Sequence, residues 1–262
     1  MIRALYTAAS GMNAQQLNID VISNNLANIN TTGYKKSRAE FQDLVYQYLM
    51  EPGAPTSQNT MSPSGIAVGL GVKPVGTQKM LSQGDLTSTS NPLDVAIQGE
   101  GFFQVQLPDG TVGYTRSGNF QLDSTGALVT QDGYAVVGAQ PIPSDATNIN
   151  ISADGQITYK QAGQAAVSSA GTLQGVRFAN PAGLKATGNN SYIETQSSGT
   201  PLQAAFAGTG MGKLQQGFLE SSNVSVVQEV VNMITAQRGY EASSKGISAA
   251  EEMISMALNL KR

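Results

Sequence analysis

The chain has 262 residues, with 15 Lys and Arg against 18 Asp and Glu, so its formal net charge is −3. It contains no cysteine and no histidine, which excludes disulfides, thiolate or imidazole metal ligands and nucleophiles activated by histidine. Charged residues make up only 13% and are not predominantly basic, so the sequence lacks the electrostatic signature of nucleic-acid binding. We therefore expect no cofactor, no metal and no nucleic-acid partner.

Residues 1–30 are predicted to form a helix, because apolar side chains recur at the spacings of a heptad seam. Gly33 is expected to follow the end of this helix, since glycine accepts a left-handed backbone conformation. Leu17 and Val21 lie away from the seam, so the helix is expected to contact neighbours on more than one side. The predicted seam consists of Leu5, Met12, Ile19, Ile22, Leu26 and Ile29.

The middle of the chain is predicted to be extended and then rich in β-structure. Residues 31–72, together with 205–221, are expected to form an extended connecting segment, and the part near 51–72 is rich in Pro, Gly, Ser and Thr. Residues 73–204 show short apolar alternations separated by turn motifs such as Asp-Gly. This spacing favours an antiparallel sandwich or barrel, so the predicted fold class is α+β.

Residues 222–262 are predicted to form a second long helix. Ser225 and Gln228 give a capping-box pattern at its start, and a second apolar strip lies away from the main heptad series. We expect this helix and residues 1–30 to form an assembly domain whose remaining apolar strips contact other copies; a helical hairpin within one chain is the alternative. The predicted seam residues are Val226, Val230, Met233, Tyr240, Ile247, Ile254 and Leu258.

Neither of two candidate catalytic devices is convincing. Residues 208–213 resemble a phosphate-binding loop only in part, because Ala207 stands where its first glycine belongs and Leu214 where it needs Ser or Thr. Paired carboxylates would suffice for glycoside hydrolysis, but three of four candidates lie in turns, where Asp is expected. We predict that the chain is not an enzyme and keep a β-rich carboxylate hydrolase as the alternative. The four carboxylates are Glu100, Asp109, Asp123 and Asp132.

Membrane insertion and a cleaved signal peptide are not expected. No stretch approaches the roughly 20 apolar residues that a spanning helix needs. No continuous apolar run follows Arg3, as a secretory signal would require.

Two long motifs resemble the signatures of bacterial flagellar rod and hook proteins. The first runs from Ser23 to Lys35, SNNLANINTTGYK, and the second from Asn223 to Glu241, NVSVVQEVVNMITAQRGYE. Residues 94–120 resemble the β domain of this family, so the resemblance covers nearly the whole chain. Length and one insertion favour the members that build the distal rod over the usually longer hook proteins. The insertion is represented by Gln47, Pro52, Gly53, Pro55, Pro63 and Gly65.

The resemblance implies a structural subunit that polymerises into a helical tube, with its terminal helices in the core and its β domain outside. Such a tube acts as a drive shaft that transmits torque from motor to hook. The implied location is the basal-body rod crossing the periplasm, reached through the flagellar type III export apparatus without a cleaved signal. The implied partners are other copies of the chain, proximal rod proteins, the hook or hook-junction protein, and the P- and L-ring proteins. Another axial protein, of the proximal rod or the hook, is the alternative within the family.

Overall fold

The computed structural model of the chain divides into two compact units. The first, called here the helix–arm unit, comprises Met1–Ala27, Ser37–Gln78 and Ser225–Arg262, and the second, the β unit, comprises Asn28–Lys36 and Lys79–Val224. The structure describes residues 2–53, 55–57, 60–161 and 166–259.

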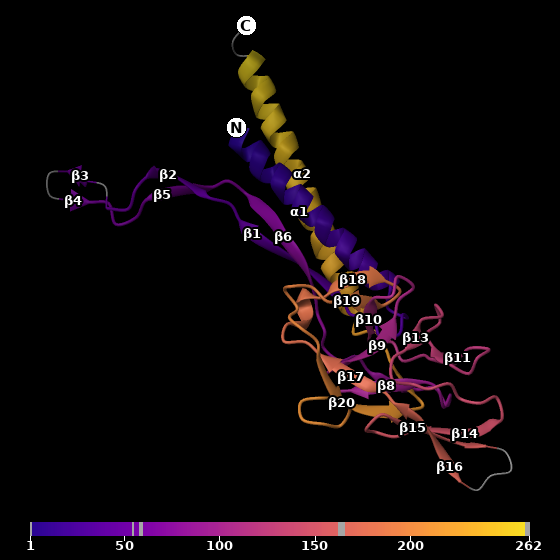
Figure 1. The fold of residues 1–262 in the computed structure, drawn as a ribbon. Helices are drawn as coiled ribbons and strands as arrows, with labels where there is room; N and C mark the ends of the chain where they lie inside the picture. The colour runs from indigo at the N-terminus through magenta and orange to yellow at the C-terminus, as the bar shows by residue number, and fades with distance from the viewer. Residues whose placement is uncertain (1, 54, 58–59, 162–165, 260–262) are drawn as a thin grey trace. The chain divides into compact units, whose positions relative to one another are not determined.

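Two long helices belong to the helix–arm unit and lie side by side (Figure 1). They are α1 (Ile2–Ala27) and α2 (Val226–Asn259). Neither contains proline, which would remove a backbone hydrogen bond from a helix interior. Gly33 has a φ of 69°, but it lies six residues beyond Ala27, the last residue of α1, and its amide bonds to the Glu220 carbonyl, so it does not cap the helix as predicted. The two predicted terminal helices are nevertheless confirmed, with slightly shorter bounds.

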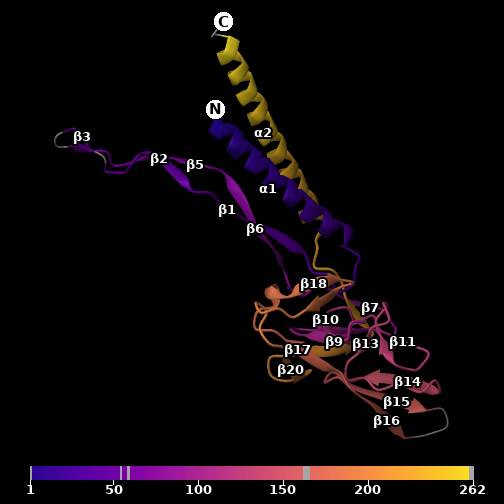
Figure 2. The ribbon, with the colours of Figure 1, turned by 45° about the horizontal axis from the view of Figure 1, so that its top comes forward.

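The extended chain between residues 37 and 79 folds into a long two-stranded ribbon, called here the arm (Figure 2). Three pairs of strands follow one another along it, β1 with β6, β2 with β5 and β3 with β4. A ribbon of two strands has no covered face along most of its length, which explains why its sequence lacks the alternation of a half-buried strand. Its strands are β1 (Ser37–Asp43), β2 (Tyr46–Met50), β3 (Pro55–Ser57), β4 (Thr60–Met61), β5 (Ile66–Gly69) and β6 (Val72–Lys79).

The β unit contains a nine-stranded sheet with the order β11-β12-β13-β9-β10-β19-β18, in which β17 also pairs with β9 and with β20. A three-stranded sheet, β14-β15-β16, and the pairs β21-β8 and β22-β7 complete the unit. Together with the terminal helices, these antiparallel pairings confirm the α+β class. The elements are β7 (Leu86–Ser88), β8 (Val95–Gln98), β9 (Phe102–Gln106), β10 (Val112–Thr115), β11 (Gln121–Leu122), β12 (Leu128–Val129), β13 (Ala135–Val136), β14 (Ala146–Ile151), β15 (Gln156–Gln161), β16 (Val167–Thr172), β17 (Gln174–Arg177), the 3-10 helix η1 (Pro181–Gly183), β18 (Lys185–Gly188), β19 (Ser191–Ile193), β20 (Leu202–Ala205), β21 (Lys213–Gln216) and β22 (Phe218–Glu220).

Strand β9 lies between two apolar cores because both faces of the large sheet are covered. Phe103 belongs to the larger core and packs edge-on against Phe120, with 5.1 Å between ring centroids. Phe102 points to the other face and joins a smaller core that includes Tyr114 and Tyr192. The buried polar side chain of Gln104, which lies on this second face of β9 with Phe102, is therefore unusual.

Two turn motifs of the sequence form chain reversals in the structure. Gly110 has a φ of 80° in the turn between β9 and β10, where its amide donates to the Leu107 carbonyl over 3.0 Å. Residues 208–212 form the connection between β20 and β21, and Lys213 begins β21. A phosphate-binding loop joins a strand to a helix, so this strand-to-strand connection does not support such a role.

Among the described residues, neither helix combines the length and the apolar character that crossing a membrane would require.

Candidate assembly surfaces and a buried ionic network

The contact between α1 and α2 is antiparallel and close. Asn25 donates a hydrogen bond to Glu229, with 3.4 Å between Nδ2 and Oε2. Ten residues earlier on α1 and ten later on α2, a Cβ atom at Gly239 would lie 3.2 Å from the Gln15 side chain. Glycine therefore permits close approach at this point, and an alanine would require the flexible Gln15 side chain to shift slightly.

The predicted seam of α1 lies partly in this contact. Ile22 is buried, with 4% of its surface exposed. Ile29 lies beyond the end of α1, in the β unit. The remaining predicted residues of this seam are partly buried: Leu5, Met12, Ile19, Leu26 and Ile29.

The predicted seam of α2 divides into two groups. Met233, Ile247 and Ile254 are partly buried, whereas the remaining predicted residues are exposed. The exposed members are Val226, Val230, Tyr240 and Leu258.

The most buried row of residues along α2 was not predicted from the sequence. Glu229, Ala236 and Ala250 are buried, and together with the partly buried Ser243 they repeat every seven residues. Sequence reasoning missed this line because it followed large apolar side chains, although small residues at heptad spacing were the available signal.

Large apolar side chains remain exposed on α2 after it has packed on α1. Val227 and Val231 are 75% and 52% exposed, and Ile234 is 47% exposed. Near the other end, Met253 and Met256 are 47% and 57% exposed. Contiguous exposed apolar surface of this kind marks a site of association.

The predicted insertion residues lie in the outer part of the arm. Gln47 is exposed on β2, and Pro52 and Gly53 are exposed in the turn that follows it. Gly65 has no room for a side chain, because a Cβ atom there would lie 2.5 Å from the Met50 carbonyl oxygen. Pro63 is exposed, and Pro55 begins β3, with its side chain outside what the structure describes.

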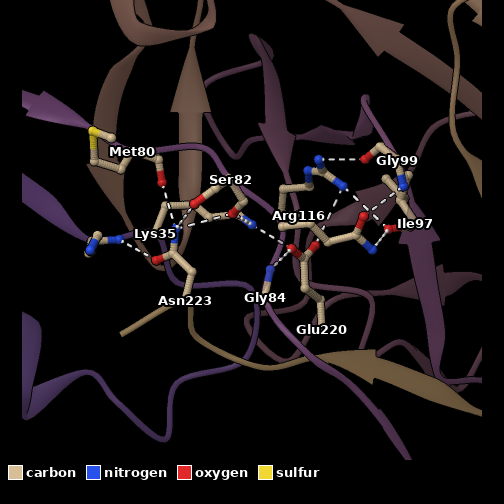
Figure 3. A network of polar contacts seen from close by, with 11 residues as sticks. Lys35, Met80, Ser82, Gly84, Ile97, Gly99, Arg116, Glu220 and Asn223 are labelled. Atoms are coloured by element: carbon tan, nitrogen blue, oxygen red, sulfur yellow. Dashed lines mark hydrogen bonds and ion pairs between the residues drawn. The ribbon is translucent and has the colours of Figure 1, made fainter. Parts of the chain in front are cut away.

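A network of charged side chains lies inside the β unit (Figure 3). Glu220, at the end of β22, forms ion pairs with Lys35 and, over 3.4 Å, with Arg116. Lys35 and Glu220 side chains are fully buried and Arg116 is 5% exposed. Lys35 Nζ also donates to the Ser82 carbonyl over 2.8 Å, and Gly84 donates its amide to Glu220 Oε1 over 2.9 Å.

The network joins the segment that follows α1 to the segment that precedes α2. The Gly33 amide donates to the Glu220 carbonyl over 2.7 Å, beside the side-chain ion pair of Lys35 with Glu220. The Lys36 amide donates to Asn223 Oδ1 over 2.8 Å. Residues 28–36 and 217–224 are therefore cross-bonded at three neighbouring points within the β unit.

Burial sets the electrostatics of this region. Desolvation lowers the pKa of Lys35, while the adjacent Glu220 carboxylate opposes that shift, and desolvation likewise lowers the pKa of Arg116. Burial raises the pKa of the neighbouring Tyr192 hydroxyl to about 12. Sequence reasoning did not single out Lys35, Arg116 or Glu220, although Lys35 and Arg116 stand in the motifs quoted above.

Two of the four carboxylates considered for a hydrolase accept local hydrogen bonds within turns. Asp109 accepts hydrogen bonds from the Thr111 amide and hydroxyl, and Asp123 accepts one from the Ser124 amide. Across the described part of the chain, no three acidic side chains gather in a way that could hold a metal ion.

Three family profiles match successive parts of this chain. Residues 5–35 match "Flagella basal body rod protein", residues 96–159 match "Flagellar hook protein FlgE/F/G D1 domain", and residues 215–260 match "Flagellar basal body rod FlgEFG protein C-terminal". The first and last of these profiles cover most of α1 and α2.

Full-length relatives include flagellar basal-body rod proteins FlgG from distant bacteria. The protein of Buchnera aphidicola subsp. Acyrthosiphon pisum is 48% identical over 254 residues, covering 97% of this chain and 98% of the relative. That of Borreliella burgdorferi is 48% identical over 264 residues, covering 100% of both chains. The hook protein FlgE of Helicobacter mustelae is 43% identical over 139 residues, but this covers 53% of the present chain and 31% of the relative.

Proposed function

Because the chain belongs to the flagellar basal-body rod protein FlgG family, a family of structural and not enzymatic proteins, we propose that it is a subunit of the distal rod. The similarity extends over essentially the whole of both chains for the rod relatives and over about half of this chain for the hook relative. The resemblance identified from the two terminal motifs is thereby confirmed. Copies of the chain assemble into a helical tube, which serves as a drive shaft and transmits torque from motor to hook.

The exposed apolar surface of α2 carries this proposal. Burying one large aliphatic side chain stabilises an association by about 1.5–3 kcal/mol, and several remain uncovered on α2 after α1 has packed against it. Val226, Val230 and Tyr240 then face other copies in the tube, while Ile247 and Ile254 support both the hairpin and its neighbours.

We infer the remaining partners of the chain from the position of a distal rod within the basal body. Proximal rod proteins lie at one end of the tube and the hook or hook-junction protein at the other, with P- and L-ring proteins around it. The subunits travel through the flagellar type III export apparatus and form the rod across the periplasm.

Electron microscopy of the concentrated chain tests this function. We expect tubular filaments whose formation rises steeply with protein concentration, because each added copy covers apolar helix surface. A chain that stays monomeric at every concentration, and that instead degrades glycans, would overturn the proposal in favour of a carboxylate hydrolase.

We further propose that the outer arm, residues 47–65, packs against adjacent copies. Tyr48, Leu49 and Ile66 are 57%, 60% and 52% exposed, and an isolated two-stranded ribbon is marginally stable in water. Deleting residues 47–65 is expected to leave polymerisation possible but to give a curved or more flexible tube, because the arm no longer opposes sliding between copies.

The tube's persistence length and curvature, measured in electron micrographs, check this expectation. A matched variant that keeps the arm but replaces Gln47 by Ala serves as the control. Straight tubes of wild-type stiffness from the deletion variant would contradict a role of the arm in rigidity.

A further inference from the structure

The inner part of the arm, strands β1 and β6, runs alongside α1, and we call it the inner arm. The chain leaves Asn25 of α1 at Ser37 and reaches Ser10 of α1 at Leu44 and Gly71. The helix rises about 22 Å between Ser10 and Asn25, and the extended chain from Ser37 to Leu44 covers about 23 Å. The matching lengths agree with Figures 1 and 2, in which the inner arm lies beside α1 and the rest of the arm extends away from it.

Asn25 holds the first end of the inner arm. Its side chain is 2% exposed. Asn25 Nδ2 donates to the Ser37 carbonyl, and Asn25 Oδ1 accepts from the Ser37 amide, each over 2.8 Å. These two bonds engage both backbone groups of Ser37, as pairing with a neighbouring strand would. Because Asn25 Nδ2 also reaches Glu229 over 3.4 Å, this contact ties the arm to both helices.

Ser10 holds the second end of the inner arm, nearer the start of α1. Ser10 Oγ accepts a hydrogen bond from the Val72 amide over 3.3 Å and donates one to the Thr7 carbonyl over 2.9 Å. The Gly71 carbonyl accepts from the Leu44 amide over 2.8 Å, so both strands of the arm are held at this point. We call Ser10, Leu44, Gly71 and Val72 the arm joint.

The arm joint depends on glycine at position 71. Gly71 has a φ of 114°, a conformation that residues with a side chain rarely adopt. A Cβ atom there would lie 2.2 Å from Ser10 Oγ and 3.4 Å from the Thr7 Cα atom. The chain therefore approaches α1 more closely than a side chain would allow. Val45, directly after Leu44, is 77% exposed.

Two separate contacts with α1 determine a direction, whereas one contact would leave the inner arm free to turn about it. A segment that is held before it meets a partner loses less conformational entropy on packing. We propose that the arm joint sets the direction in which the outer arm leaves α1, and that the outer arm needs this direction to pack against adjacent copies. The inference rests on the proposed function of the chain as a rod subunit.

A pair of spin labels measures the direction of the outer arm, because the natural chain has no cysteine. The labels are attached to Gln16→Cys on α1 and Gln47→Cys on β2, two exposed positions. Ser10→Leu places a larger side chain where Gly71 lies without changing position 71 itself, and leucine favours a helix. In the free chain, we expect Ser10→Leu to broaden the distance distribution between the labels at least twofold.

The same substitution is expected to change the tube although the arm is complete. Electron micrographs of the unlabelled Ser10→Leu chain should show curved tubes whose persistence length is at least twofold shorter than that of wild type, as expected for deletion of residues 47–65. Asn13→Leu is the matched control, since it adds the same side chain to an exposed position of α1. It should leave both the label distances and the tubes unchanged.

Two further measurements guard against damage to the helices. Labels at Gln16→Cys and Thr235→Cys report on the pairing of α1 with α2, and their distance should be the same with and without Ser10→Leu. Ser10→Ala removes the acceptor of the Val72 amide without adding bulk. It should broaden the distance between Gln16 and Gln47 in the same sense but by less, so it replaces Ser10→Leu if that variant separates the helices.

The label distances and the tubes separate this inference from the proposed function. Unchanged label distances in both Ser10 variants would overturn the arm joint and leave rod assembly intact. A broadened distribution with straight tubes of wild-type stiffness would overturn the need for a fixed arm direction. If wild type forms no tubes, the rod function fails, while the label distances of the free chain still support or overturn the joint.

Broadened distances together with curved tubes, both absent in Asn13→Leu, would support the inference.

Discussion

Replacing Glu220 by Ala is expected to destabilise the β unit by about 3–5 kcal/mol, the usual effect of removing one partner from a buried ion pair. The substitution leaves the charges of Lys35 and Arg116 without their shared carboxylate inside the protein. It also removes the acceptor of the Gly84 amide. Because total stabilities of domains lie near 5–15 kcal/mol, we expect a large fall in the urea midpoint, followed by circular dichroism.

Two variants provide the controls for this prediction. Glu220→Gln keeps the shape of the side chain and an oxygen acceptor while removing the charge, so its effect should be smaller than that of Glu220→Ala. Glu194→Ala removes an exposed carboxylate of the same unit and should change the midpoint little. If the free energy of unfolding of the Glu220→Ala protein lies within about 1 kcal/mol of the wild-type value, the two cations need no buried partner.

Ile247→Asp is expected to abolish assembly while leaving the β unit folded. Ile247 is partly buried on α2, and the residues three and four positions away are Ser243, Ser244, Ala250 and Glu251, none of which is a cation. Loss of an aliphatic side chain from a packed site costs about 2–5 kcal/mol, and desolvation of the new carboxylate adds several more. Since every copy carries the defect, the cost recurs at each addition to the tube.

The matched control is Ser248→Asp, which introduces the same charge at the next position of α2, where the side chain is exposed. Sedimentation and electron microscopy should show tubes for Ser248→Asp and none for Ile247→Asp at concentrations where wild type assembles. The thermal transition of the β unit should be the same in both, because α2 belongs to the other unit. Normal tubes from Ile247→Asp would mean that Ile247 faces solvent in the polymer.

The sequence predicted those elements whose residues carry a local period. The heptads of α1 and α2 and the Asp-Gly turns of the β unit were readable, since each depends on a few neighbouring residues. The arm was expected only to be extended, because strand pairing between residues far apart, such as Tyr46 with Gly69, leaves no local trace in a ribbon exposed on both faces.

The contacts that decide how the elements join were harder to predict. Ala236 and Ala250 are the closest-packed residues of α2 because they are small, whereas a pattern of hydrophobicity gives them little weight. Lys35 and Glu220 are separated by 185 positions, and an isolated Lys or Glu is normally a surface residue. Only the folded chain brings their charges together and removes them from water.

In the proposed rod, the cross-bonds between residues 28–36 and 217–224 are expected to carry part of the load within each copy. If α1 and α2 are pulled apart, the tension reaches the β unit through these two segments, and it meets the bonds from Gly33, Lys35 and Lys36 first. These bonds lie close together and share the force. The tension therefore passes from residues 28–36 directly to residues 217–224. The sheets beyond these bonds remain outside that path. In the proposed rod, substitutions in the sheets beyond these bonds are therefore expected to leave the connection between the two helices as strong as before.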